Sequence, residues 1–210
     1  MQLRALAFAL GAAAAVAACG PDDQPVTGAE TAAARGLALA APAPVCVFFN
    51  VPPLWTVFGA PVGTPMGAVV WVENGIPVSA RRFLQMGGAW SFNWMRIEPV
   101  PAVFTLGAGQ TDHTNNINAG FDFTGLGFPV NKVTFNWLNL GGYENLSVNG
   151  SPIFVGQLSA PPAVLGGAGV ATAWGFVAGG KQGTTTLTGP ITKILVGGQE
   201  EWIDNVCAYP

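Results

Sequence analysis

An alternating aromatic segment is the part of the sequence best suited to bind a ligand. Trp90 and Trp94 flank Phe92 at intervals of two residues. In an extended strand this spacing puts both indole rings on one face, roughly 13 Å apart at about 3.3 Å per residue. Such a strip can stack on successive sugar rings, with the amides of Asn115 and Asn116 as polar partners. The alternative is that these tryptophans fill the core, because large aromatic side chains dominate core packing.

A second candidate chemistry is calcium binding. Hard cations take oxygen ligands from carboxylates, side-chain amides and backbone carbonyls. Asp112 lies in a polar segment with Asn115, Asn116 and Asn118, and all four side chains offer such oxygens. No EF-hand spacing is present. The sequence therefore allows a structural calcium ion with Asp112 among its ligands, and it requires no other cofactor.

Groups suited to catalysis are few. His113 is the only histidine, so multi-histidine metal sites are excluded. It lies in the polar segment 110–116, which we interpret as a solvated loop. The sequence has no Gly-x-Ser-x-Gly motif, and nothing among the eight carboxylates of residues 45–210 singles out an acid and a base. We therefore expect a protein that is not an enzyme, with a carbohydrate-active enzyme as a minor alternative.

The N-terminus has the pattern of an export signal. After a short positive segment, residues 5–16 form an apolar run, shorter than the roughly 20 residues of a membrane-spanning helix. Val16-Ala17-Ala18-Cys19-Gly20 follows directly and resembles the bacterial lipobox, in which the cysteine is lipidated and becomes the new N-terminus. The resemblance implies a signal peptide over residues 1–18 and a lipid on Cys19. An ordinary secretory signal, cleaved just before the cysteine, is the alternative.

Lipidation would place the protein on a bacterial membrane, because two or more acyl chains give stable anchoring. The resemblance leaves the outer or inner membrane open, so the location is the periplasm or the cell surface. Residues 19–44 are rich in Pro and Ala and predict a flexible tether. Thr27-Gly28-Ala29-Glu30 fits a capping box, so a short helix over residues 31–39 is the alternative.

Two further cysteines bracket the expected domain. Cys46 lies in the first strand-like run, and Cys207 is three residues from the end. Exported proteins occupy an oxidising compartment where thiols pair, and lipidation of Cys19 leaves an even number. We expect a disulfide between Cys46 and Cys207 if the first and last strands are neighbours. Two buried free thiols are the alternative.

The elements that must position these residues are strands. From Val45 onward, apolar residues recur at intervals of two rather than 3.6. Asn74-Gly75 and Asn149-Gly150 predict tight hairpin turns, because both residues of each pair tolerate positive φ. We expect one all-β domain over residues 45–210, a two-sheet β-sandwich or a barrel. The pattern predicts about a dozen short strands, at 45–51, 68–72, 90–95, 102–106, 117–123, 133–138, 145–149, 153–155, 170–177, 184–188, 191–196 and 201–209.

Two further segments bear on the architecture. Residues 163–178 are mostly small and apolar, and we interpret them as a glycine-rich loop leading into a buried strand, with a second membrane span as the alternative. The Gly-Gly-x-Glu segments 141–144 and 197–200 are interpreted as equivalent corners, where glycine supplies an unusual φ and each glutamate accepts backbone N–H groups. A paired acidic site is the alternative for these two segments.

Three segments carry a resemblance to known proteins. Phe128-Pro129-Val130-x-x-Val133-x-Phe135, residues 141–150 and residues 197–206 look like uncharacterised exported bacterial β-sandwich proteins. The closing Ile203-Asp204-Asn205-Val206 is similar to the last strand of galactose-binding-like jelly rolls, including many carbohydrate-binding modules. This resemblance implies a jelly-roll type of sandwich and no activity. Because such modules often hold a structural calcium near their terminal strands, it also makes Asp204 a candidate calcium ligand.

Composition narrows the class of function. Only 9% of the 210 residues are charged, the net charge is −3, and the few Lys and Arg are dispersed, so we expect no nucleic-acid partner. We predict a non-catalytic envelope lipoprotein that acts as a surface binding module, with glycans as candidate ligands. The alternative is a structural or protein-interaction lipoprotein without a small ligand. An exposed strip of tryptophans would favour the first function.

Overall fold

The computed structural model describes residues 42–210. The predicted signal peptide (1–18), the lipidated Cys19 and the tether up to residue 41 lie outside the described residues and stay predictions. Within residues 42–210, no helix is long and apolar enough to cross a membrane. The elements are β1 (Val45–Val47), β2 (Val57–Gly59), the 3-10 helix η1 (Ala60–Val62), β3 (Val69–Glu73), β4 (Ile76–Leu84), β5 (Trp90–Ser91), β6 (Trp94–Pro99), β7 (Gln110–Asn115), β8 (Ile117–Asp122), β9 (Lys132–Val148), β10 (Phe154–Gly156), β11 (Val164–Leu165), β12 (Ala168–Val177), β13 (Gly180–Thr188) and β14 (Lys193–Tyr209).

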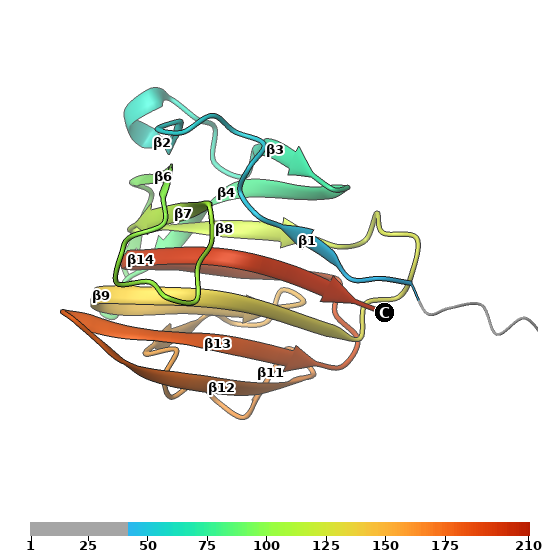
Figure 1. Ribbon diagram of the computed structural model, residues 1–210. Helices are drawn as coiled ribbons and strands as arrows, with labels where there is room; N and C mark the ends of the chain where they lie inside the picture. The colour runs from blue at the N-terminus through green and yellow to red at the C-terminus, as the bar shows by residue number, and fades with distance from the viewer. Residues whose placement is uncertain (1–41) are drawn as a thin grey trace, which may run out of the picture. The chain divides into compact units, whose positions relative to one another are not determined.

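The strands pair antiparallel into one continuous sheet, which confirms the all-β prediction (Figure 1). One branch has the order β11-β12-β13-β9-β14-β7-β6-β2, and β1 pairs with β14. The second branch joins β10, β8, β4, β3 and β5 to the same two long strands, β9 and β14. Side chains from both branches meet in one hydrophobic core, among them Val78, Ile97, Phe121, Phe135 and Ile194. The two branches therefore pack face to face as the layers of a β-sandwich.

The pairing of β9 with β14 is irregular near two glycine pairs. Residues 141–142 of β9 and 197–198 of β14 fall in one paired stretch, with Gly198 opposite Glu144 and register shifts just after it. A Cβ on Gly197 would lie 2.3 Å from the carbonyl oxygen of Ile117, so only glycine fits there. The prediction of corners between strands was wrong, because both segments lie inside single strands at register shifts, and only Gly142 of the four glycines has a positive φ. The strands predicted at 133–138 and 145–149, and at 191–196 and 201–209, are accordingly the two single strands β9 and β14.

Other predictions of local structure succeed or fail for identifiable reasons. Both residues of Asn74-Gly75 and of Asn149-Gly150 have positive φ, as the turn signals predicted. The strand predicted at 102–106 was wrong, because Phe104 packs from a loop onto the outer face of the sheet, against Leu138 and Trp202. Residues 168–177 do form a strand, β12, but the predicted burial was wrong: half of its residues are exposed, because only the two residues of β11 pair on its outer side.

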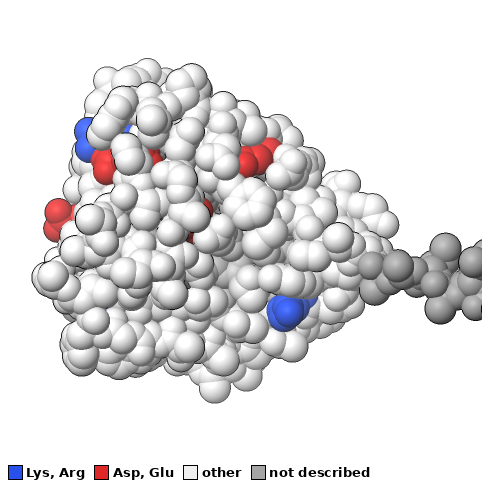
Figure 2. All heavy atoms as spheres, viewed as in Figure 1, with Lys and Arg blue, Asp and Glu red and all other residues white. Residues whose placement is uncertain are grey.

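Six of the eight carboxylates in residues 42–210 are buried, and few charges appear on the face in Figure 2. Both carboxylate oxygens of Asp112 and of Glu201 lack a hydrogen-bond partner among the described residues. Burial raises the pKa of Asp112 well above its usual value, and it does the same for Glu201, where Glu144 and Asp112 add to the effect. Burial also raises the pKa of Glu144 to about 7 and that of Asp204 to about 6. The interior therefore holds several carboxyl groups in their protonated form.

We predict that the free energy of unfolding decreases as pH rises from 5 to 8. In this window the unfolded chain has released protons that the native Glu144, with a pKa of about 7, and the native Glu201 still bind, so unfolding is favoured at higher pH. Glu201→Gln should raise Tm at pH 8 and leave it almost unchanged at pH 5, because glutamine resembles the protonated acid. Thermal unfolding followed by circular dichroism measures both values. A lower Tm for the variant at pH 8 would contradict the prediction.

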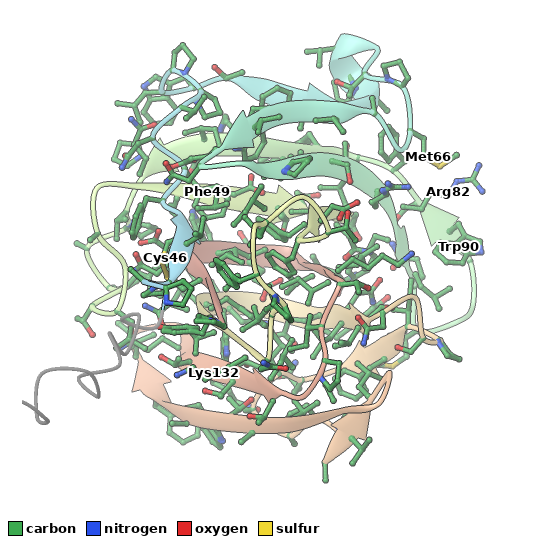
Figure 3. All side chains as sticks on the ribbon, turned by 90° about the vertical axis from the view of Figure 1, so that its right-hand side faces the viewer. Cys46, Phe49, Met66, Arg82, Trp90 and Lys132 are labelled. Atoms are coloured by element: carbon green, nitrogen blue, oxygen red, sulfur yellow. A yellow bond between two sulfur atoms is a disulfide. The ribbon has the colours of Figure 1, made fainter. Side chains whose placement is uncertain are left out.

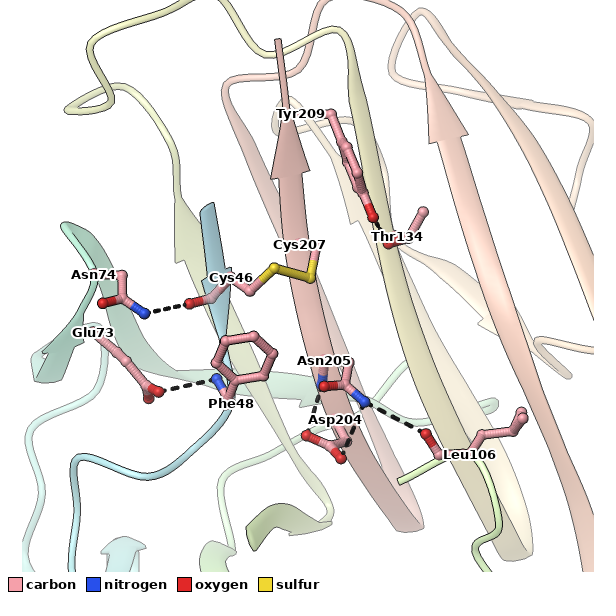
Figure 4. The surroundings of a disulfide bond; sticks show 10 residues. All are labelled: Cys46, Phe48, Glu73, Asn74, Leu106, Thr134, Asp204, Asn205, Cys207 and Tyr209. Carbon is pink, nitrogen blue, oxygen red and sulfur yellow. Dashed lines mark hydrogen bonds between the residues drawn. A yellow bond between two sulfur atoms is a disulfide. The ribbon is translucent and has the colours of Figure 1, made fainter. Parts of the chain in front are cut away.

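A disulfide joins the first and last strands, as the sequence predicted (Figures 3 and 4). Cys46 of β1 lies directly opposite Cys207 of β14, and their sulfur atoms are 2.11 Å apart. Next to it, the Glu73 side chain accepts the backbone N–H of Phe48 (3.0 Å), and Asn74 Nδ2 donates to the Cys46 carbonyl (2.8 Å). The disulfide and these bonds fix the short strand β1, which has only three residues, on the edge of the core.

Replacing both cysteines by alanine should lower the free energy of unfolding by about 2–5 kcal/mol, because the cross-link closes a loop across most of the domain. Urea denaturation of the variant and of the parent protein measures this difference. Dithiothreitol should shift the parent midpoint toward that of the double variant and should leave the variant unchanged. Equal midpoints for the oxidised parent and the variant would show that the cross-link does not contribute.

Candidate functional site

The outer face of β6 carries three polar or aromatic side chains at alternating positions. Trp94, Arg96 and Glu98 lie on this face, whereas Met95 and Ile97 point into the core and are fully buried. The alternation follows from the pleat of an extended strand, in which successive side chains point to opposite faces. One strand thus supplies an indole, a guanidinium and a carboxylate side by side.

Two neighbouring strands complete the site. On β7, Asn115 is paired with Trp94 and His113 with Arg96, and on β14, Trp202 is paired with His113. Directly paired residues point to the same face of a sheet. Arg96, His113 and Trp202 therefore form a row across β6, β7 and β14.

Glu98 connects the members of this row. Its Oε1 contacts the Arg96 guanidinium and His113 Nδ1 (3.1 Å), and its Oε2 accepts a hydrogen bond from Trp202 Nε1 (3.3 Å). Burial raises the pKa of Glu98, but the hydrogen bonds from His113 and Arg96 outweigh this effect and leave it below its usual value. Glu98 is therefore ionised at neutral pH and orients three side chains at once.

His113 is buried within this arrangement. It is 8% exposed, so the predicted solvated loop at 110–116 was wrong: the segment is β7, and the side chains of Thr111, His113 and Thr114 have hydrogen-bond partners on neighbouring strands. The imidazole stacks on Trp202 with ring centroids 3.8 Å apart and meets the edge of Trp94 at 4.9 Å. Because Glu98 accepts from Nδ1, the neutral ring carries its proton there. Burial lowers the pKa of His113, and Glu98 opposes that shift.

Trp55 adds an exposed indole beside the half-buried Trp94. Its side chain is 59% exposed, and its φ of 69° is unusual for a bulky residue. Such backbone strain is of order 1–3 kcal/mol and persists only where the surroundings impose it. Here the Trp55 N–H donates to the Ile97 carbonyl (2.7 Å). The Arg96 guanidinium carbon lies 5.5 Å from the Trp55 ring centroid and 5.0 Å from that of Trp94. We call Trp55, Trp94 and Arg96 the tryptophan platform.

Side-chain amides border the platform. Asn115 Oδ1 accepts hydrogen bonds from Asn93 Nδ2 (2.8 Å) and Asn116 Nδ2 (3.0 Å). Asn116 Oδ1 in turn accepts from Gln85 Nε2 (2.9 Å). These amides orient one another, and the pairing of Asn115 with Trp94 places them against the aromatic surface. The structure therefore brings together three of the predicted ligand-binding residues, Trp94, Asn115 and Asn116.

The fourth predicted residue, Trp90, is arranged differently. It is 53% exposed, but it belongs to β5, which pairs with β4, while Trp94 begins β6. The predicted continuous strand over residues 90–95 was wrong, because Phe92 and Asn93 interrupt it. Trp90 projects at the same edge of the molecule as Arg82 and Met66 (Figure 3). The second aromatic ring of the site is Trp55, which strand periodicity could not identify because it lies in a loop after Pro52-Pro53.

The predicted calcium ligands do not form one site. Asp204 Oδ2 accepts the N–H of Ala108 and Oδ1 that of Asn205, both at 2.7 Å. It thereby fixes the loop 100–109 to the outer face of the sheet. Asp112 points into the interior, on the opposite face. In the described range no group of three or more His, Cys, Asp or Glu side chains could hold a metal ion.

The two Gly-Gly-x-Glu glutamates also have separate roles. Glu144 is buried and accepts hydrogen bonds from the Asn139 amide and from the N–H of Leu158 (3.2 Å), whereas Glu200 is exposed. The prediction that each accepts backbone N–H groups is therefore confirmed for Glu144 alone. The burial of one of the two carboxylates gives no support to the alternative of a paired acidic site.

No protein-family model, curated protein or solved structure matches this chain. The platform itself therefore carries the functional inference. It offers the exposed indole of Trp55 and the half-buried indole of Trp94, a guanidinium held in place by an ionised carboxylate, and a row of partly exposed amides. This combination suits a ligand with both apolar faces and hydroxyl groups.

Two substitutions should move the pKa of His113 in opposite directions. Glu98→Gln should lower it further, because the nearby negative charge that favours the imidazolium is removed. Arg96→Gln should raise it, because Arg96 opposes protonation of His113. His113 is the only histidine of the chain, so one imidazole NMR signal followed against pH gives the value directly. Shifts of the same sign in both variants would refute the described arrangement.

Proposed function

We propose that this protein is a non-catalytic glycan-binding module of the bacterial cell envelope and that the tryptophan platform is its binding surface. The observation that carries the proposal is the exposed, strained Trp55 held beside Trp94 by the Arg96 guanidinium. Sugar rings present C–H faces that stack on indoles and hydroxyl groups that bind amides. Because the aromatic side chains are already held in place, binding costs less conformational entropy.

The polar neighbours of the platform support the same ligand class. The Asn115 Nδ2 and Asn93 Oδ1 atoms make no hydrogen bond with any described residue, so a donor and an acceptor stand free beside Trp94. Sugar hydroxyls accept from the first and donate to the second. In this proposal the lipid on Cys19 holds the domain at the membrane, and residues 19–44 give it the reach to contact envelope polysaccharide.

Binding of the purified protein to a glycan array tests the proposal. Trp55→Ala and Trp94→Ala should each weaken binding to a positive glycan by about tenfold or more, since each removes a large stacking surface. Titration calorimetry with that glycan measures the loss.

Trp174→Ala is the matched control. Trp174 is also an exposed tryptophan, 43% accessible, but it lies on β12, which four strands separate from β6. Its removal should leave the affinity unchanged. Absence of any array signal, or equal losses in all three variants, would contradict the proposal.

A protein-interaction role is the second candidate, and the exposed end of β12 favours it. Phe176 is 78% exposed beside Trp174, and residues 170–177 have no described strand on their outer side. An apolar edge strand of this kind is a site for pairing with another chain. Glycan binding that is lost in the platform variants but retained in Trp174→Ala separates the two candidates.

A further inference from the structure

Folding buries most of the acidic side chains of the described domain and leaves the basic ones accessible. Residues 42–210 contain six Lys and Arg against eight Asp and Glu, a formal net charge of −2. Six of the acids are buried, and only Asp122 and Glu200 are exposed. All six cations are at least partly accessible. Accessible cationic side chains of the described domain therefore outnumber accessible acidic ones, which favours anionic ligands where the cations have no acidic partner.

An open groove with about 200 Å³ of space lies on the outer face of the other layer of the sandwich. Its floor is one row across β4, β8, β14 and β9, in which Ser79 is paired with Gly120, Gly120 with Leu195, and Leu195 with Ser147. A Cβ on Gly120 would lie 2.8 Å from Ser79 Oγ and 3.1 Å from Arg81 Cγ. The absence of a side chain at Gly120 therefore keeps the floor open.

Three charged side chains line this groove, Arg81, Asp122 and Lys193. Arg81 is held by a hydrogen bond from its Nε to Ser79 Oγ (2.9 Å), which leaves both of its terminal nitrogens without a partner among the described residues. Lys193 is paired with Asp122 in the strand register, yet they form no ion pair. The ion pairs found within the described chain all involve Glu98, so the groove cations stay available.

Asp122 gives the groove a second kind of partner. Its Oδ1 accepts the N–H and the hydroxyl of Thr124 (2.9 and 2.6 Å), whereas Oδ2 accepts no hydrogen bond from a described residue. The Thr124 bonds lower its pKa, and nearby Lys193 and Arg81 add to this effect, so the carboxylate is ionised at neutral pH. It opposes a highly charged anion such as phosphate and can accept a hydrogen bond from a hydroxyl group.

We infer that this groove binds the carboxylate of an acidic sugar, at a site separate from the tryptophan platform. The free end-on edge of Arg81, formed by its two terminal nitrogens, matches a carboxylate in geometry, and Lys193 supplies a second positive charge. Asp122 Oδ2 accepts a hydroxyl of the same sugar. A volume of about 200 Å³ is below that of sites for drug-sized ligands and suits a single ring.

Glucuronate is the probe, with glucose and inorganic phosphate as comparisons. In the full-length protein, glucuronate should shift amide NMR signals of β4, β8 and β14 with a millimolar Kd. Glucose lacks the carboxylate and should leave these signals in place, and phosphate should bind more weakly because Asp122 repels it. Failure of glucuronate to bind, or equal binding of glucose or phosphate, would overturn the inference.

Variants locate the site. Arg81→Gln and Lys193→Gln should each weaken glucuronate binding by about tenfold, as expected for loss of a charge-assisted hydrogen bond. Arg82→Gln is the matched control: Arg82 is exposed and adjacent on β4, but it does not line the groove. Unchanged affinity in the first two variants, with native amide spectra, would exclude the groove. Trp55→Ala should bind glucuronate normally, so failure of the platform proposal does not affect this one.

Discussion

The pairing of β9 with β14 is the interaction on which the structure depends. These 17-residue strands lie side by side through both layers, and their pairing has register shifts next to the glycine pairs. Glycine is required because the backbone of Ile117 and Asn118 approaches Gly197 within van der Waals contact. The same pair of strands carries Trp202 toward the tryptophan platform and Leu195 and Ser147 into the groove floor. The groove floor is thus built partly on this pair, and the platform on β6 is connected to it through His113 and Trp202.

The buried carboxylates fall into two classes, those without hydrogen-bond partners and those whose charge is stabilised by neighbouring donors. Asp112 and Glu201 have no hydrogen-bond partners, so protonation is the way each avoids an isolated charge in a medium of low polarity. Glu98 is buried as well, but Arg96, His113 and Trp202 solvate its charge and keep it ionised. The first class removes negative charge from the molecule, and the second uses it to organise a site. Together they explain how an acidic sequence produces a surface on which accessible cations exceed accessible acids.

Much of the fold could be predicted from the sequence because its signals are local. The alternation of apolar residues predicts strands, and each Asn-Gly pair predicts a turn, from only a few neighbouring residues. The paired cysteines join the ends of the domain through a single bond. The platform could not be predicted in the same way. Trp55 reaches it through a loop, and His113 joins it because β7 lies between β6 and β14. The polar segment 110–116 resembles a loop because most of its polar side chains find their partners on neighbouring strands, which the sequence of one segment does not reveal.

The two candidate sites differ in how they are held ready for a ligand. In the platform, Glu98 neutralises the charge of Arg96, and the rings of Trp55 and Trp94 lie against the Arg96 guanidinium. The accessible surface of the platform is therefore largely aromatic. In the groove, Ser79 positions the Arg81 side chain without neutralising its charge, so the accessible surface of the groove is charged. A neutral sugar ring is therefore suited to the first site and a charged one to the second.

Because the two candidate sites occupy opposite outer faces of a sandwich with a packed core, their ligand preferences should be independent, as effects at distant sites usually are. A module with two such faces can bind one acidic polysaccharide through different sugar units, and simultaneous binding would raise its avidity without any new contact.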